Sequence, residues 1–335
     1  MTDLEKISVD DAVSLVTDAF AANHVPLEIA ASVARALVSA EAEGQVGHGF
    51  SRIEDYIAQV RTGKINANAN IATTTPLPTS VVTDADFGFA YPALDQSIYT
   101  GIEIAKEYGS ATMSVFQSHH CGALSVQVDK IARAGLIGLM FANTPKAMAP
   151  WGGNTPFFGT NPIAFATPRR DQSPLVVDLS LSKVARGKVM HAKKTGQPIP
   201  EGWALDTDGN PTTDPNAALG GSMLPIGDAK GSALALVVEI LAAVLTGGAT
   251  SNKASSFLSP DGPPPGVGQF LIAISPGRSN DAFLDRLETL LTEIIDIENT
   301  RLPGTRRASA ITSATENGLR IPAHYIARTQ ALARG

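Results

Sequence analysis

The sequence predicts an α/β protein in which helices flank a mixed sheet and a helical region precedes it. Helix-like segments fill the first 62 residues, and from Ile71 onward strand-like and helix-like segments alternate. Of the 335 residues, 44% are hydrophobic and 17% are charged, which supports a large core. A chain of this length exceeds the usual single-domain size, so one large unit or two intertwined domains are expected.

Three helices are expected at the N-terminus. Ser8 and Asp11 resemble a capping box that opens the first, and the second runs from Pro26 to about Glu43. The stretch Gly44–Gly49 interrupts the pattern with three glycines in six residues, which indicates a tight turn. A third helix is expected from Phe50 to about Arg61.

The alternating part predicts strands at 80–83, 111–116, 136–142, 163–166, 175–177 and 270–274, and helices at 92–108, 123–134 and 280–297. Such units favour a sheet that is parallel at least in part. The most hydrophobic stretch, Ser232–Leu245, is too short to span a bilayer and contains Glu239, so a buried helix is expected. Long Gly/Pro-rich loops at 143–161 and 255–269 are expected to bind ligand or a second subunit.

The composition argues against several classes of protein. The net charge is −6 and no basic run offers a nucleic-acid footprint, so no nucleic-acid partner is expected. The single cysteine and the acidic N-terminus, which does not resemble a signal peptide, favour the cytoplasm and no membrane partner. Neither GxGxxG nor a P-loop occurs, and the absence of CxxC and HExxH predicts no metal site.

The segment His48–Tyr56 carries the strongest chemical signal. If a helix starts near Gly49, then His48, Arg52 and Tyr56 share one face. Arginine can hold a carboxylate through two hydrogen bonds, and histidine can exchange a proton near neutral pH. A capping histidine with a surface arginine is the alternative interpretation.

The turn at 118–122 joins a strand to a helix, where backbone N–H groups favour phosphate. An ordinary polar connection is the alternative. Cys121 lies beside two histidines, but a packed turn residue is favoured over a nucleophile.

Several segments together carry a family resemblance. They are GHGFSRIEDY at 47–56, SHHCGAL at 118–124, NTPKAMAPWGGNTPFFGTNPIAFATPR at 143–169, VVDLSLSKVARGKV at 176–189, GQPIPEGWALDTDGNPTTDP at 196–215, AKGSAL at 229–234 and RLPGTRR at 301–307. The chain resembles, over almost its whole length, the malate/L-lactate dehydrogenase family that lacks the Rossmann fingerprint. The resemblance implies an NAD(P)-dependent oxidoreductase that works as a homodimer with NADPH or NADH.

The resemblance also implies site residues and domains. His48 matches the proton donor, Arg52 matches the carboxylate-binding position with Thr160 nearby, and Arg186 and Gly187 match further ligand contacts. The cofactor-binding matches are His119, His120, Cys121, Gly122, Ala123, Asp178, Leu179, Ser180, Lys230, Leu302, Pro303, Gly304, Thr305, Arg306 and Arg307. A helical region at 1–67, joined by 308–335, is expected beside a cofactor- and substrate-binding domain at 68–307.

Within the family, SHHCGAL and GPPPGVGQ look closest to reductases of delta-1-pyrroline-2-carboxylate and delta-1-piperideine-2-carboxylate. The resemblance implies that those reductases use a Ser-His-Asp relay. In this chain Gly47 is at the position of the Ser and Lys188 is at the position of the Asp. A protonated cyclic imine needs less acid catalysis than a ketone, so imine reduction is the expected function. The alternatives are a malate/L-lactate-type 2-hydroxy-acid dehydrogenase, for which Lys146, Lys188 and Lys230 are the candidates for a second cation, and a non-catalytic ligand-binding relative.

Overall fold

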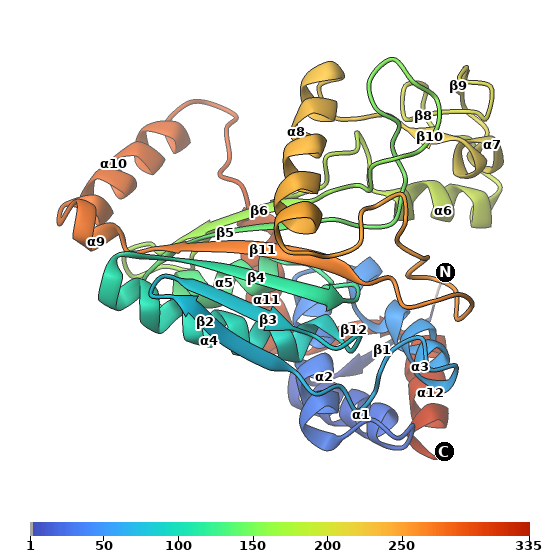
Figure 1. Cartoon of the computed structure of the whole chain (residues 1–335), viewed down its shortest axis with the longest axis horizontal. Helices are drawn as coiled ribbons and strands as arrows, with labels where there is room; N and C mark the ends of the chain where they lie inside the picture. The colour runs from blue at the N-terminus through green and yellow to red at the C-terminus, as the bar shows by residue number, and fades with distance from the viewer. Residues whose placement is uncertain (1–2) are drawn as a thin grey trace.

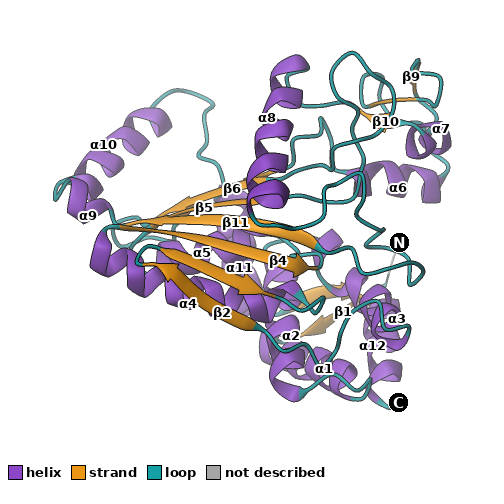
Figure 2. Ribbon diagram, viewed as in Figure 1, coloured by secondary structure: helices purple, strands orange, loops and turns teal. Residues whose placement is uncertain are grey.

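A computed structural model describes residues 3–335, with side chains at all of these positions except 278 and 279. A seven-stranded mixed sheet forms its centre (Figures 1 and 2). In spatial order its strands are β2 (Ala72–Leu77), β3 (Ser80–Asp84), β4 (Ser110–Ser118), β11 (Val267–Ile274), β5 (Ile137–Ala142), β6 (Ile163–Thr167) and β7 (Leu175–Leu179). The expected mixed α/β fold is confirmed.

The strand directions bring three loops to one edge of the sheet. β11 pairs antiparallel with both β4 and β5, so those two strands run in the same direction. β6 pairs antiparallel with both β5 and β7, so β7 also shares that direction. The carboxyl ends of β4, β5 and β7 therefore lie at one edge, which is where ligands bind in α/β sheets. Among the described strands of this sheet, β3 and β4 form the one parallel pair.

Helices α4 (Ala90–Tyr108) and α5 (Leu124–Arg133) cover one face of the sheet (Figure 1). Their Ala, Leu, Val and Ile side chains pack with the sheet into one core. At Gly101 in α4, a Cβ would lie 2.3 Å from Met113 Sδ in β4. Because glycine has no side chain, α4 can pack closely against the sheet at this position.

The N-terminal helices form a second core with the C-terminal end of the chain. Its elements are α1 (Val9–Ala21), α2 (Leu27–Ala42), α3 (Ile53–Arg61), α11 (Thr305–Asn317), α12 (Ala323–Ala333) and a ribbon of β1 (Leu4–Ile7) and β12 (Leu319–Pro322). Ser8 caps α1 as expected, because its Oγ accepts a hydrogen bond from Asp11 N at 3.0 Å. The domain boundaries expected at 67 and 308 remain a proposal.

A third core lies above the carboxyl edge of the sheet. It is built from α6 (Arg186–Thr195), α7 (Pro215–Gly220), α8 (Ala229–Glu239), η3 (Ile240–Leu245) and a small sheet of β8 (Ala204–Leu205), β9 (Pro211–Thr212) and β10 (Ser222–Met223). The expectation of a buried helix at Ser232–Leu245 is half wrong. Ala235, Val238 and Ala242 are buried, but an opposite apolar face is exposed.

Other expectations also needed correction. The third helix starts at Ile53, because two 3-10 turns, η1 (Val46–His48) and η2 (Phe50–Arg52), precede it. The helix expected at 280–297 is α10 (Phe283–Ile295), which follows the short α9 (Pro276–Ser279). The ribbon of β1 and β12, strand β2 and the small sheet were not anticipated, because short strands carry little periodic signal. None of the described helices is long and apolar enough to cross a membrane.

Candidate active site

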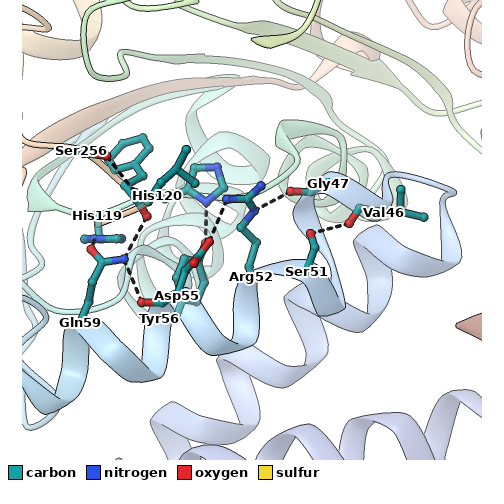
Figure 3. Close-up of polar contacts among 12 residues, drawn as sticks. Val46, Gly47, Ser51, Arg52, Asp55, Tyr56, Gln59, His119, His120 and Ser256 are labelled. Carbon is teal, nitrogen blue, oxygen red and sulfur yellow. Dashed lines mark hydrogen bonds and ion pairs between the residues drawn. The ribbon is translucent and has the colours of Figure 1, made fainter. Parts of the chain in front are cut away.

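The turn after β4 presents two neighbouring histidines in different ways (Figure 3). His119 is 1% exposed, and its Nε2 lies 2.9 Å from Gln59 Oε1. Burial lowers the pKa of His119 to about 3, so it is neutral. Its side chain is part of the core, and any contact of His119 with a cofactor would come from its backbone. His120 is only partly buried and is the histidine of the pair that can meet a ligand.

A chain of hydrogen bonds holds the His120 imidazole. Its Nδ1 lies 2.5 Å from Tyr56 Oη, which lies 3.0 Å from Tyr91 Oη. Burial raises the pKa of both tyrosines, so both phenols keep their protons. Tyr91 can then donate to Tyr56, and Tyr56 to His120 Nδ1, which places the imidazole proton on Nε2. No hydrogen bond to that Nε2 occurs within the described part of the chain.

His48 lies against His120, with ring centroids 5.2 Å apart and planes 24° apart. Its Nδ1 is buried and has no hydrogen-bond partner among the described residues. Burial first, and then the charge of Arg52, lowers the pKa of His48 to about 4. The shared helical face expected for His48, Arg52 and Tyr56 is wrong, since the first two lie in separate 3-10 turns. His48 nevertheless stacks on a face of the His120 ring, while Tyr56 in α3 contacts the Nδ1 edge of that ring.

Arg52 is braced from both sides. Its Nε donates to Gly47 O at 2.7 Å, and its Nη1 lies 3.2 Å from Asp55 Oδ2 (Figure 3). The loop itself is fixed by Glu41, which accepts from Phe50 N at 2.9 Å. A Cβ on Gly49 would lie 2.0 Å from Glu41 Oε2, so only glycine allows this approach. The guanidinium is thus positioned before any ligand binds.

The segments expected to bind the cofactor converge at the carboxyl ends of β4 and β7. Asp178 Oδ2 accepts from Ser125 N at 2.9 Å, which joins β7 to the first turn of α5. Glu43 accepts from Ser125 Oγ at 2.5 Å and lies 3.0 Å from Arg307 Nε. The backbone of Gly304 packs on Val176, where a Cβ would lie 2.6 Å from Val176 O. Segments 119–123, 178–180 and 302–307 therefore form one surface.

This surface changes the expectation for the cofactor phosphate. Asp178 already accepts from an N–H of the α5 N-terminus, and Glu43 lies beside it. Two carboxylates weaken the attraction of that helix end for an anion. The side chains of Cys121 and Ala123 are buried, and a Cβ at Gly122 would lie 2.7 Å from Tyr91 Oη, so no side chain of 121–123 is available to a ligand. We therefore predict that the turn 119–123 contacts the ribose or the nicotinamide of the cofactor rather than a phosphate.

The remaining residues of that surface vary in accessibility. Leu179 is 40% exposed at the end of β7, and Ser180, which follows it, is partly buried, so this segment offers one apolar side chain and one hydroxyl. Leu302 is buried, Thr305 Oγ1 donates to Leu302 O at 2.8 Å, and Pro303 and Arg306 are exposed. An apolar platform with hydroxyls and an arginine beside it fits a nicotinamide cofactor. Lys230 lies apart from these segments, exposed at the start of α8.

Three further substrate-binding candidates lie on the loop after β5 and at the start of α6. Thr160 Oγ1 is 3.4 Å from Thr144 Oγ1, on the loop that follows β5. Arg186 is partly buried at the start of α6, and its Nη1 donates to Lys146 O at 3.3 Å. No carboxylate among the described residues pairs with Arg186, and burial lowers its pKa. Gly187 is exposed, with open space where a Cβ would be.

Sequence patterns missed several residues of the site. Phe257 lies 5.0 Å from His120 and 5.4 Å from His119 between ring centroids, so it forms a wall of the site. Gln59 and Glu43 bind the histidine turn and the cofactor segments. The only available signal was that Phe257 falls in a long Gly/Pro-rich loop. Neither Gln59 nor Glu43 stands out, because each acts through contacts distant in sequence.

Comparisons with known proteins agree with this geometry. The chain is 50% identical over 301 residues to (2R)-3-sulfolactate dehydrogenase (NADP(+)) of Chromohalobacter salexigens, covering 90% of each protein. It is 39% identical over 308 residues to delta(1)-pyrroline-2-carboxylate/delta(1)-piperideine-2-carboxylate reductase of Pseudomonas aeruginosa, covering 91% of this chain and 90% of that protein. The crystal structure of delta1-piperideine-2-carboxylate reductase from Pseudomonas syringae matches with a TM-score of 0.93 at 35% identity, covering 98% of this chain and 99% of that one.

The family model described as malate/L-lactate dehydrogenase matches residues 7–329. The resemblance seen in the sequence is confirmed, as is the expectation of an NAD(P)-dependent oxidoreductase. Because the family model spans residues 7–329 and a relative covered to 90% is 50% identical, the chain belongs to the malate/L-lactate dehydrogenase family.

Proposed function

We propose that this protein is an NADPH-dependent dehydrogenase of a small 2-hydroxy acid that carries a second anionic group, of the 3-sulfolactate type. The observation that carries the proposal is Arg186, a partly buried guanidinium with no carboxylate partner among the described residues. A partly buried guanidinium whose hydrogen bond among the described residues is to a carbonyl is completed well by an anion, because hydrogen bonds between charged groups are strong. Together with Arg52 it supplies two cations for two anionic groups. The 50% identity to a sulfolactate dehydrogenase points the same way.

α6 lies within electrostatic range of the other cation. Burial raises the pKa of Asp55, while the charges of Arg52 and of Lys194 in α6 lower it. Lys194 is at the opposite end of α6 from Arg186, and we propose that the substrate binds between the loop of Arg52 and this helix. Arg52 and Thr160 hold the carboxylate at C1, and Arg186 holds the distal sulfonate or carboxylate.

The bound cofactor supplies or accepts a hydride at C2. Proton exchange with the oxygen on C2 falls to the His48–His120 pair, in which protonated His120 would give up its Nε2 proton and keep its Nδ1 proton, then donated to Tyr56 Oη. His48 was expected to be this donor, but its unpartnered Nδ1 orients it less well than the Tyr56 bond orients His120. The assignment between the two histidines is tested below.

Substrate binding itself promotes protonation of the pair. Burial, and the charge of Arg52 in addition, lower the pKa of both His48 and His120. A substrate carboxylate that pairs with Arg52 cancels this charge, so the pKa of each histidine rises when the substrate binds. The site would therefore take up a proton together with the anion, as reduction of a ketone requires.

Reduction of a cyclic 2-imino carboxylate, the function first expected, is the second candidate. The observation in its favour is that no described residue offers His48 Nδ1 a hydroxyl or a carboxylate, which agrees with loss of the relay. Lys188 is exposed on α6, and no hydrogen bond joins it to His48 in the described part of the chain. An imine that arrives protonated would not need that acid. Arg186 would then have no second anion to bind.

A substrate panel tests both candidates. NADPH oxidation is followed with 3-sulfopyruvate, oxaloacetate, pyruvate and the two cyclic imines at equal concentrations. We expect the highest kcat/KM for sulfopyruvate or oxaloacetate and the lowest for pyruvate, which lacks the second anion. A higher kcat/KM for either imine would overturn the order, and no turnover with any compound would favour a non-catalytic ligand-binding protein.

The role of Arg186 is tested by Arg186→Gln. We expect kcat/KM for the dianionic substrate to fall about a hundredfold or more, since a charged hydrogen bond contributes about 3 kcal/mol. The value for pyruvate should stay nearly unchanged. Lys188→Gln, which removes an exposed charge from the same helix, is the matched control. Equal losses for both substrates would show that Arg186 acts on the fold rather than on the second anion.

We also propose a homodimer in the cytoplasm. The exposed apolar face of α8 and η3 has side chains between 41% and 64% exposed, at Leu234, Leu236, Val237, Ile240, Val244 and Leu245. A contiguous apolar patch of this kind marks an interface, and a second copy provides a matching surface by symmetry. Light scattering should give twice the chain mass, and Val244→Glu should yield monomers. A monomeric wild-type protein would contradict the proposal.

A further inference from the structure

The loop that carries Phe257 is held through its own carbonyl groups. Gln59 Nε2 donates to Phe257 O at 2.9 Å, and Thr62 Oγ1 donates to Pro260 O at 3.0 Å. Lys64 Nζ donates to three further carbonyls of the loop, those of Ser256, Ser259 and Asp261, at 2.7, 2.8 and 2.9 Å. Three side chains at the end of α3 and just after it thus donate five hydrogen bonds to five backbone carbonyls of residues 256–261.

Lys64 is unusual in its burial. The residue is 2% exposed, although lysine is almost never buried unless its charge is compensated. Its three ammonium hydrogens are matched by three carbonyl oxygens, and no carboxylate forms an ion pair with Nζ among the described residues. Without the ammonium, three carbonyl dipoles would point at one another in a buried space. The loop therefore forms a carbonyl cage around a cation supplied by the chain.

The cage lies next to the histidines. Phe257 follows the first caged carbonyl directly, and its ring contacts both His119 and His120. Gln59 connects the loop to the histidine turn. Its Nε2 donates to Phe257 O, and its Oε1 contacts His119 Nε2 (Figure 3). A shift of the loop would move the aromatic wall of the site without touching Arg52 or Arg186.

We propose that Lys64 is a positioning residue whose ammonium acts as a built-in monovalent cation, and that it sets the place of Phe257 against His120. The kinetic part of this inference rests on the proposed function. The cage itself does not, since it is a property of the folded chain. A variant without the lysine side chain should leave a site for a small free cation such as ammonium or potassium.

The first test uses Lys64→Ala and needs no substrate. We expect its melting temperature to fall by roughly 4 °C or more, as for loss of a buried hydrogen-bonded charge. Ammonium chloride should restore much of the loss, whereas tetramethylammonium chloride at the same ionic strength should not, because that ion is too large and donates no hydrogen bond. Lys253→Ala, an exposed lysine in the neighbouring turn, should show neither effect. Equal responses to both salts would refute the cage.

The second test measures turnover with whichever substrate the panel identifies. Lys64→Ala should lower kcat/KM about tenfold or more, because small misplacements of site residues are costly. Ammonium should restore this value over the same concentration range in which it restores the melting temperature. Recovery of stability without recovery of turnover would refute the positioning role but keep the cage. If no substrate is found, the first test still decides the cage, so the failure of either proposal can be recognised separately.

Discussion

The hydrogen bond between Tyr56 and His120 makes a prediction whose magnitude follows from the structure. Tyr56→Phe removes one hydroxyl that has two buried partners, His120 Nδ1 at 2.5 Å and Tyr91 Oη at 3.0 Å. Leaving buried polar groups unsatisfied costs about 1–3 kcal/mol. For a chain of this length that corresponds to a melting temperature lower by roughly 1–4 °C. The His120 ring also loses the bond that fixes its tautomer, worth about 1–1.5 kcal/mol, so kcat/KM should fall about five- to tenfold.

The assay is NADPH oxidation with the best substrate of the panel, measured beside thermal unfolding. Tyr91→Phe is the matched control, because it removes the outer hydroxyl of the same chain but leaves the bond from Tyr56 to His120 intact. We expect it to lose stability to a similar degree while turnover changes less than about twofold. If Tyr56→Phe loses stability but keeps full turnover, then the oriented His120 is not the proton donor, and His48 takes that role.

Three further predictions concern the same site. If His120 is the donor, as proposed, His48→Ala should keep near-normal turnover while cofactor still binds by fluorescence titration; a loss of about a hundredfold or more would assign the proton to His48 instead. Arg52→Lys should raise KM strongly because the two-pronged guanidinium is lost although the charge remains, and an unchanged KM would place the carboxylate elsewhere. Burial lowers the pKa of His48 to about 4 and that of His119 to about 3, whereas histidines in the unfolded chain keep the ordinary pKa of about 6.5. Below about pH 6.5 the unfolded state therefore binds more protons than the native state. The urea midpoint should therefore fall as pH drops from about 6.5 to 4, and a midpoint that rises or stays level would contradict neutral histidines in the native state.

The sequence by itself determined the fold class, the family and the nature of the chemistry. Strand and helix periods are local properties, so the alternation from Ile71 onward and the cap at Ser8 were readable from neighbouring residues. The motifs around His48, Arg52 and His120 carried the resemblance that the family match confirms. The burial of α8 was misjudged, because apolar content shows that a surface will be covered but not what covers it.

Only the tertiary structure decided how the site is assembled. The insertion of β11 between β4 and β5 brings a loop that begins some 250 residues into the chain beside a turn near residue 120, and no local pattern encodes that pairing. This pairing explains why the Phe257 ring contacts His120 and why the Lys64 ammonium is surrounded by carbonyl oxygens. It also separates the two adjacent histidines, one neutral in the core and one held by Tyr56. Burial and hydrogen bonding set those roles, and both depend on side chains that meet only when the chain has folded.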